Sequence, residues 1–447
     1  MKSDDRFHRI VPGTNLLPVP IALSLCAVLL LAVTLPIDQA AHQGRISLPR
    51  WLSIGGPEDA RAILGAILGA VSTVLALIFS VSLLVFSSAA NQFGPRLMHR
   101  FLRDRTMQVT LGLFVATFLQ SLLAFVIVRQ EEDFVFVPQV TVLSSVMLVI
   151  LSFGFLVIYN HRVGTSIQTN NVLARIVEDL YAAITELSKE KAGTKAGLGG
   201  ASILLGRDET QAQCMAEGTP VRATMSGYVQ RIQRNRLIRS ADHADAVICL
   251  AFRPGQFVVQ GETLGYVWPP THHEGLAPAI REGVKLGQQR TLEQDLEFGI
   301  AQLVEIGLRA LSQAINDMYT GLNCIDWLGD ALRMLAAVPA SDSCWRSTDG
   351  SIRLIEPPLR FSRVVKSAFD AIRQAAMGNA AVTIRLLKTS ERLAPFLQAD
   401  DQRQALFDQV EAIGESVSTS SFARGDREDL EAAYKKAHRA LVVHQLK

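Results

Sequence analysis

The stretch that decides the fold is the run of 31 residues from Ala60 to Ala90, ARAILGAILGAVSTVLALIFSVSLLVFSSAA, in which Arg61 is the only charged residue. At 1.5 Å per residue, a helix of this length measures roughly 45 Å, more than the roughly 30 Å of a bilayer's hydrocarbon core. The run therefore predicts a membrane-spanning helix that tilts or protrudes. Gly94-Pro95 follow it and predict its end, because the residue before a proline disfavours helical backbone.

The composition agrees with a membrane protein. The chain has 447 residues, 49% of them hydrophobic and 19% charged, and its formal net charge is +2. This near-neutral balance gives no reason to expect nucleic acid as a partner. Long apolar runs are confined to the first 160 residues. The remainder alternates between polar and apolar residues as a soluble domain does.

Four apolar runs predict four transmembrane helices within a membrane domain of residues 1–160. The predicted spans are 16–35, 60–90, 109–128 and 135–158. The first run also resembles a signal peptide, but its length favours a retained helix. Apart from Arg61, no Asp, Glu, Lys, Arg or His lies inside these spans. Their absence argues against a pump or coupled transporter and is compatible with a passive pore or an anchor.

Charges near the span ends predict the orientation. Four arginines separate the second and third spans, namely Arg96, Arg100, Arg103 and Arg105. The loop between the third and fourth spans instead carries Glu131, Glu132 and Asp133. Because cytoplasmic loops carry the excess of Lys and Arg, we expect a multi-pass protein of the bacterial inner membrane with both termini in the cytoplasm.

One face of the second span is built from small residues. At 100° per residue, eight residues between Gly65 and Ala90 fall in one arc about 80° wide. They are Gly65, Gly69, Ser72, Ala76, Ser80, Leu83, Ser87 and Ala90. We call these residues the small-residue stripe; Leu83 is its one bulky member. The stripe is typical of close helix packing in membranes. It also suits a pore-lining face on which a ring of Leu83 side chains forms a dewetting constriction.

The segment after this span predicts a hinge and a short basic helix. Asn91, Gly94 and Pro95 form the expected hinge. Helical spacing then places Arg96, Arg100 and Arg103 opposite an apolar side. This pattern favours an interfacial helix that contacts anionic lipid headgroups, with a solvated basic loop as the alternative.

Two motifs carry a family resemblance. The first is Ser87-Ser-Ala-Ala-Asn-Gln-Phe-Gly-Pro-Arg-Leu97, continued by Phe101-Leu-Arg-Asp-Arg105. The second begins at Asp295-Leu-Glu-Phe-Gly299 and continues through Ile315-Asn316-Asp317 and Cys324-Ile-Asp-Trp-Leu328. Together they resemble the DUF2254 family of bacterial predicted membrane proteins. The resemblance covers nearly the whole chain and implies an architecture but no activity.

The region after the spans predicts an α+β cytoplasmic domain. Residues 161–217 are expected to form a helical stalk and a Gly- and Ala-rich linker. Residues 218–270 predict a small β-barrel, because glycines alternate with apolar residues as in tight turns. Their pattern is similar to a biotinyl/lipoyl-like barrel-sandwich domain. No lysine lies between Lys195 and Lys285, however, so no prosthetic group can be carried there.

Residues 271–447 predict a mainly helical domain with a β-hairpin near 345–355 that turns at Asp349-Gly350. Polar groups here invite functional interpretations. Asp295, Asn316 and Asp317 could converge on a site, but helix caps and buried hydrogen-bond partners explain them more simply. His272-His273-Glu274 could bind a metal, but adjacent residues diverge on regular elements, which favours an exposed loop.

No catalytic constellation, metal site or cofactor is predicted. The cysteines Cys26, Cys214, Cys249, Cys324 and Cys344 are scattered and lack a C-x-x-C spacing, which favours reduced, buried thiols. We therefore expect a homo-oligomeric passive pore or channel-like protein, not an enzyme, with the second span lining the axis. The alternative is a membrane-anchored scaffold or sensor whose cytoplasmic domain binds a partner protein.

Overall fold

The chain folds into two compact units, Met1–Val172 and Leu173–Lys447. The computed structural model describes residues 17–46, 49, 54–93, 105–131, 134–166, 169–195, 205–338, 343–347 and 350–442. Each unit has its own buried core and is considered by itself.

In the described part of the first unit, four helices are long and apolar enough to cross a membrane. They are α1 (Pro18–His42), α2 (Pro57–Phe93), α4 (Arg105–Ile127) and α5 (Gln139–Ser166). The prediction of four apolar helices is confirmed. A short hairpin of β1 (Arg129–Glu131) and β2 (Phe134–Phe136) joins the last two.

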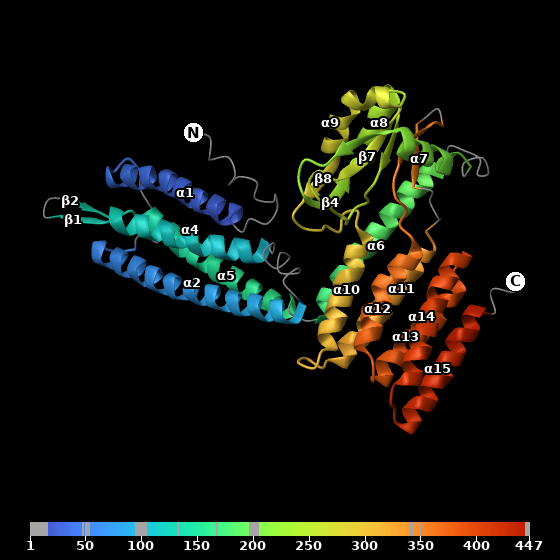
Figure 1. The fold of residues 1–447 in the computed structure, drawn as a ribbon. Coiled ribbons are helices and arrows are strands. Elements are labelled where there is room, and N and C mark those ends of the chain that lie inside the picture. The colour runs from blue at the N-terminus through green and yellow to red at the C-terminus, as the bar shows by residue number, and fades with distance from the viewer. Residues whose placement is uncertain are drawn as a thin grey trace. The chain divides into compact units, whose positions relative to one another are not determined.

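Helix α4 is the centre of this unit, because it packs against α1, α2 and α5 (Figure 1). More than half of its span is buried, against about a fifth for each of the other three helices. Its buried residues include the polar side chains Gln108, Thr110, Thr117, Gln120 and Ser121. In a membrane, such side chains form interhelical hydrogen bonds, which stabilise helix association where hydrophobic burial adds little.

Two helices have ends that differ from those of the predicted spans. The fourth helix begins at Gln139, not at residue 135, because Phe134–Phe136 pair with β1 as a strand. The first helix does not end near Leu35 but continues through Pro36 to His42. A consequence is that one carboxylate, Asp38, lies inside the first helix and is only 2% exposed. The described helices therefore do contain a buried ionisable residue.

The second unit begins at Leu173, inside α6 (Thr169–Lys195), and continues with α7 (Leu205–Glu217) and an α/β region. Its strands are β3 (Thr219–Arg222), β4 (Gly227–Ile232), β5 (Val247–Leu250), β6 (Phe257–Val258), β7 (Thr263–Trp268), β8 (Val284–Gly287), β9 (Cys344–Arg346) and β10 (Ile352–Ile355). Between them lie the helices α8 (Arg234–His243), η2 (Pro270–His272) and α9 (His273–Gly283).

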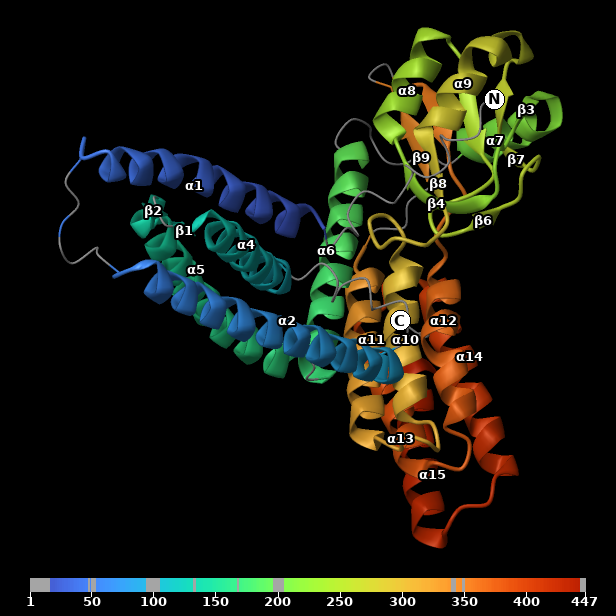
Figure 2. The same ribbon diagram turned by 90° about the vertical axis from the view of Figure 1, so that its left-hand side faces the viewer.

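These described strands do not form the small barrel expected for residues 218–270. They lie in two sheets, one with the order β3-β7-β5-β10-β9 and one with the order β6-β4-β8. The predicted hairpin is present as β9 and β10, but it belongs to the first sheet, where β10 pairs in parallel with β5. Local glycine spacing cannot reveal that β5 pairs with β10, a strand about a hundred residues further along the chain. Helices α8 and α9 pack against the strands of this sheet (Figure 2).

The predicted linker contains a helix, α7. Its anchor is Cys214, which is fully buried against Val247, Cys249 and Ile355. Alternate residues of β5, Ile248 and Leu250, point into a separate core with α8 and α9. The sheet is therefore covered on both faces, and α7 supplies the second cover that an unstructured linker could not.

The rest of the second unit is a helical bundle (Figure 2). Its helices are α10 (Leu296–Ala310), α11 (Met318–Ala336), α12 (Phe361–Ala375), α13 (Ala380–Leu393), η3 (Ala394–Phe396), α14 (Asp400–Thr419) and α15 (Arg424–Val442). Helix α10 packs against both α11 and α12, and the pairs α12–α14 and α13–α15 extend the layer. Apolar residues at helical spacing, such as Ile300, Leu303 and Val304, fill its interior.

Candidate functional site

Helix α2 buries one face against the other helices of the first unit. This face holds Ala60, Leu64, Val71, Ile78 and Ser82, all at most 3% exposed. They recur four or seven residues apart, as one side of a helix does. The four apolar residues among them belong to two separate apolar clusters with residues of α4 and α5. The packing face of α2 is therefore made of ordinary core residues, not of the small-residue stripe.

The small-residue stripe lies on the opposite side of α2 and faces away from the bundle. Its members from Gly65 to Ser87 are all exposed, and Leu83 is 68% exposed. A Cβ atom added at Gly65 or Gly69 would meet nothing within 4 Å. Packing between the described helices of one chain therefore does not account for the stripe.

The hydroxyl groups of the stripe are satisfied within α2. Ser72 Oγ donates to the carbonyl of Leu68 at 2.7 Å, and Ser80 Oγ donates to that of Ala76 at 3.0 Å. Serines that bond to the preceding turn tolerate an apolar environment. The stripe can therefore face either lipid, another protein surface or water without an unpaired donor at these two positions.

The expected hinge falls mostly outside the described residues. Asn91 lies near the C-terminal end of α2. Gly94, Pro95, Arg96, Arg100 and Arg103 lie in the segment 94–104, which the structure does not describe.

Hydrogen bonds between polar side chains join the helices inside the bundle. Ser82 and Tyr159 share a hydrogen bond of 2.8 Å between α2 and α5. Thr117 and Ser152 share one of 2.9 Å between α4 and α5. Gln120 of α4 also donates to Ser144 of α5 at 3.1 Å. The positions of charged residues in the sequence do not indicate this polar interface, whereas the Thr, Ser and Gln residues of α4 do.

One end of the bundle is tied together by Asp38 and Gln139. The Asp38 carboxylate accepts from the backbone amides of Val140 and Thr141 at the start of α5, at 2.8 and 3.0 Å. Gln139 accepts from the amide of Ile54 at 2.7 Å, just before α2. These bonds satisfy orphan amides at a helix start, which a membrane environment cannot solvate.

In the second unit, the predicted polar residues do not converge. Asp295 is the N-cap of α10 and accepts from the Phe298 amide. Asp317 is the N-cap of α11, and Asn316 before it has a left-handed φ of 51°. The 15 residues of α10 separate the two caps by about 22 Å. Asp326, further along α11, pairs with Arg385 at 2.6 Å.

The His272-His273-Glu274 segment is not the expected loop. His272 ends the short helix η2, and His273 and Glu274 begin α9. Among the described residues, no group of three or more His, Cys, Asp or Glu side chains is placed to hold a metal ion.

Comparisons with known proteins agree with the architecture. The family described as "Predicted membrane protein (DUF2254)" matches residues 13–392. Two similar proteins are the uncharacterized protein Mb1321c of Mycobacterium bovis and the uncharacterized protein Rv1290c of Mycobacterium tuberculosis. Each is 27% identical over 383 residues, which cover 83% of this chain and 71% of the relative. No solved structure matches the chain. From the extent of the family match, the chain belongs to the DUF2254 family of predicted membrane proteins.

Proposed function

We propose that the protein is a homo-oligomeric, channel-like protein of the bacterial inner membrane in which copies of α2 surround a central axis. The observation that carries the proposal is the exposure of the small-residue stripe on the outer side of α2. A protein of four apolar helices needs no such face if lipid is its only neighbour, because lipid is matched by bulky apolar side chains.

The exposed face of α1 provides the comparison. It presents Ile21, Leu25, Leu29 and Val33, all more than half exposed. Such a face suits lipid tails. The outer side of α2 also presents bulky side chains, among them Leu77 and Leu84, which are 61% and 70% exposed. Beside them it presents the small-residue stripe, in which Gly65 and Gly69 allow a second backbone to approach closely. We therefore assign α1 to the lipid side of the assembly and α2 to its axis.

Leu83 would set the narrowest point of the axis. It is the bulky member of the stripe, and a ring of leucines closes a pore by excluding water. Leu84, which is 70% exposed, provides a matched control because it has the same size but lies 100° away around the helix. Both Leu83→Gly and Leu84→Gly introduce a glycine at about 1 kcal/mol of helix propensity.

The test is solute and ion flux through purified protein in liposomes. Leu83→Gly should raise the flux several-fold, whereas Leu84→Gly should leave it near the wild-type level. A strictly monomeric particle in detergent would contradict the proposal. So would the absence of flux under both voltage and osmotic downshift.

The orientation belongs to the same proposal. Arg96, Arg100 and Arg103 follow α2 in sequence, and acidic residues follow α4, so positive charge favours the cytoplasm at that end. Both termini and the second unit would then be cytoplasmic. Reporter fusions at residue 447 and in the loop near residue 132 should report opposite sides of the membrane.

A second candidate function is a membrane-anchored scaffold or sensor. The observation that favours it is a group of exposed apolar side chains around the start of α11, where Ile315, Met318 and Tyr319 are 44%, 38% and 82% exposed. Exposed apolar groups of this kind mark protein interaction sites when they are contiguous. A pull-down from native membranes that recovers only the protein itself would count against it.

A further inference from the structure

The second unit has an open groove between α8 and the segment formed by η2 and α9. Helices α8 and α9 pack against each other and lie side by side in both views (Figures 1 and 2). The groove has a volume of about 640 Å³, within the range of about 300–1,000 Å³ that is usual for small-molecule sites. We call it the α8–α9 groove. Its polar lining residues are Arg236, Arg239, Ser240, His243, Thr271 and His272.

Three of these residues form a row along α8. Arg236, Arg239 and His243 follow one another at spacings of three and four residues, so the Cβ atoms of neighbours lie about 5–6 Å apart. His243 Nδ1 lies 2.7 Å from the carbonyl oxygen of Arg239. Because that oxygen can only accept, Nδ1 carries a proton, and Nε2 becomes a second donor when the imidazole is protonated. The row therefore presents two guanidinium groups and an imidazole to the groove.

Arg239 has no carboxylate partner in the part of the chain that the structure describes. Its side chain is exposed, and its Nε donates to the carbonyl of Asn235 in the same helix at 3.2 Å. Arg236 is instead paired with Glu282 of α9. Among the described residues that line the groove, none is acidic. The guanidinium of Arg239 therefore borders the groove with its charge uncompensated by an ion pair.

The acidic residues near the end of α8 are bound elsewhere. Asp242 and Asp245 both accept from Arg353 of β10, at 3.0 and 2.8 Å. Neither of them lines the groove. Their hydrogen bonds attach the end of α8 to the five-stranded sheet, so they are not available as partners for Arg239.

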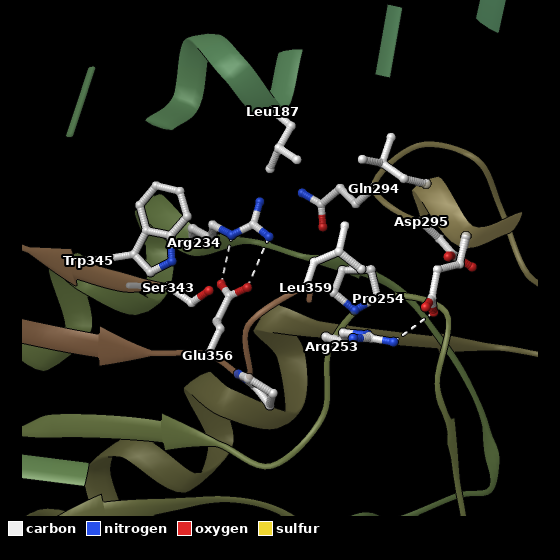
Figure 3. Close-up of a pocket in the computed structure, with 13 residues that line it drawn as sticks. Leu187, Arg234, Arg253, Pro254, Gln294, Asp295, Ser343, Trp345, Glu356 and Leu359 are labelled. Carbon is white, nitrogen blue, oxygen red and sulfur yellow. Dashed lines mark hydrogen bonds and ion pairs between the residues drawn. The ribbon is translucent and has the colours of Figure 1, made fainter. Parts of the chain in front are cut away.

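A smaller cavity of the second unit, with a volume of about 70 Å³, shows the opposite arrangement (Figure 3). Each charged residue of its lining is paired with an opposite charge. The pairs are Arg234–Glu356, Arg253–Glu297 and Arg290–Asp295, with hydrogen bonds of 2.7 to 3.0 Å. These arginines hold segments of the fold together. Arg239 bonds only to its own helix, which leaves its terminal nitrogens available to a ligand.

The lining suits a phosphate group better than a carboxylate. A guanidinium binds either group through paired N–H donors. A carboxylate, however, carries one charge and two oxygens, whereas a phosphate monoester carries about two charges and three acceptor oxygens. It can therefore accept from Arg239 and from a neighbour in the row at once. The hydroxyl groups of Ser240 and Thr271 also line the groove, and neither is hydrogen-bonded to a described residue.

From this arrangement we propose that the α8–α9 groove binds a phosphate-bearing anion whose phosphate accepts from Arg239. Arg236 or His243, one helical turn to either side, supplies the second contact. The pair of Arg236 with Glu282 does not prevent this, because both side chains are about half exposed, at 45% and 61%, and an exposed pair is weak. The rest of the ligand lies towards Thr271 and His272.

The phosphate monoester can belong to a soluble molecule or to the headgroup of phosphatidic acid, and the test separates the two sources. It uses the purified full-length protein in a non-ionic detergent and a phosphate-free buffer. The soluble probe is inorganic pyrophosphate, and calorimetry should show saturable binding to one site per chain. The lipid probe is phosphatidic acid in mixed micelles, with phosphatidylcholine as the control lipid. It should raise the melting temperature where phosphatidylcholine does not.

Variants of Arg239 locate the binding. Arg239→Gln should weaken the binding of the active probe about tenfold, because a charge-assisted contact is lost. Arg239→Lys keeps the charge but not the paired donors, so its loss should be smaller. Arg231→Gln is the matched control, since Arg231 lies outside the groove and pairs with Glu293 at 3.1 Å. It should leave the affinity within about twofold of the wild type, because distant surface charges are screened.

Binding to pyrophosphate alone would assign the groove to a soluble ligand, and binding to phosphatidic acid alone would assign it to a lipid. Without either probe, Arg239→Gln should melt at the wild-type temperature, because it removes an exposed side chain bonded only to its own helix. Absence of a response to both probes would overturn the proposal. Equal losses of affinity in Arg239→Gln and Arg231→Gln would also overturn it, since only the overall charge would then matter. The proposal concerns the second unit and does not depend on whether the first unit forms a pore.

Discussion

The carboxylate of Asp38, in the last turns of α1, accepts from both the backbone amide and the hydroxyl of Thr141, at 3.0 and 2.7 Å. Thr141 lies in the first turn of α5. A carboxylate at a helix N-terminus satisfies amides that have no partner within the helix and interacts favourably with the helix dipole. Here the capping residue comes from a different helix, so the end of α1 and the start of α5 are held together by a buried charge.

Removing this cap should destabilise the first unit. We expect Asp38→Ala to cost about 2–3 kcal/mol, because the buried amide and hydroxyl of Thr141 and the partly buried amide of Val140 lose their acceptor. Asp38→Asn should cost less, since the amide oxygen can still accept. The measurement is thermal or denaturant unfolding of the full chain in detergent. Asp59→Ala serves as control, because Asp59 bonds the exposed amide of Gly56; a loss for Asp38→Ala no larger than for Asp59→Ala would contradict the role.

The four apolar helices could be predicted because each needs only a local run of apolar residues. Their ends could not. The apolar run of α1 stops at Leu35 and Pro36 follows, yet the helix continues to His42. Asp38 stabilises that extension through contacts about a hundred residues away. Hydropathy measures how favourably a segment transfers to lipid. It carries no information about the hydrogen-bond partners of a buried carboxylate in the folded protein.

The hydroxyl groups of α2 should contribute differently to the free energy of unfolding, depending on the face of the helix on which they lie. Ser82 Oγ is buried and lies 2.8 Å from Tyr159 Oη, whereas Ser80 is exposed and donates to its own helix. Ser82→Ala should therefore cost about 0.5–1.5 kcal/mol, as interhelical hydrogen bonds in membranes do. Ser80→Ala should stay within about 0.5 kcal/mol of the wild type. Denaturant unfolding in detergent measures both, and equal losses would contradict the assignment of faces.

In the second unit, individual helices and strands could be predicted better than the way in which they pair and pack. The hairpin near 345–355 follows from Asp349-Gly350 between apolar residues, and it is present as β9 and β10. Its partner β5 is not predictable, because parallel pairing depends on residues far apart in sequence. The buried ion pairs Arg234–Glu356 and Arg253–Glu297 could not be predicted for the same reason. Their arginines and carboxylates come from separate segments, and each alone resembles an ordinary surface charge.

Replacing Gly255, which lies against Asp295, should destabilise the second unit more than replacing a glycine with open space around it. Gly255 has a φ of 88°, and an added Cβ would overlap the Asp295 carboxylate. Gly261 has a φ of 86° but nothing within 4 Å of its added Cβ, so it is a matched control. Gly261→Ala should cost about 1–2 kcal/mol for the left-handed backbone. Gly255→Ala should cost at least about 1 kcal/mol more, because Asp295 must move from Arg290 and from the start of α10.

Thermal unfolding of the two alanine variants gives this comparison directly. The excess loss in Gly255→Ala should shrink when Asp295 is also replaced by Ala, because the overlapping carboxylate is then absent. Equal losses of stability for Gly255→Ala and Gly261→Ala would show that the overlap with Asp295 does not destabilise the variant.

The buried thiols should resist alkylation in the folded protein. Burial raises the pKa of the Cys324 thiol to about 12, and a hydrogen bond to Cys214 together with burial raises the pKa of Cys249. Since the thiolate is the reactive form, about 1 in 10⁴ Cys324 side chains is ionised at pH 8. Raising the pH to 10 should leave Cys324 mostly protonated. Iodoacetamide followed by mass spectrometry should find Cys324 and Cys249 unmodified at either pH.

The same chain unfolded in urea is the control, because unfolding returns both thiols to an ordinary pKa and to solvent. Both should then be alkylated within the same exposure time. Cys344, which is only partly buried, should react in the folded protein before either of them. Alkylation of Cys324 at the rate of Cys344 in the absence of urea would show that α11 opens readily and that the burial of Cys324 against Gly307 of α10 does not protect it.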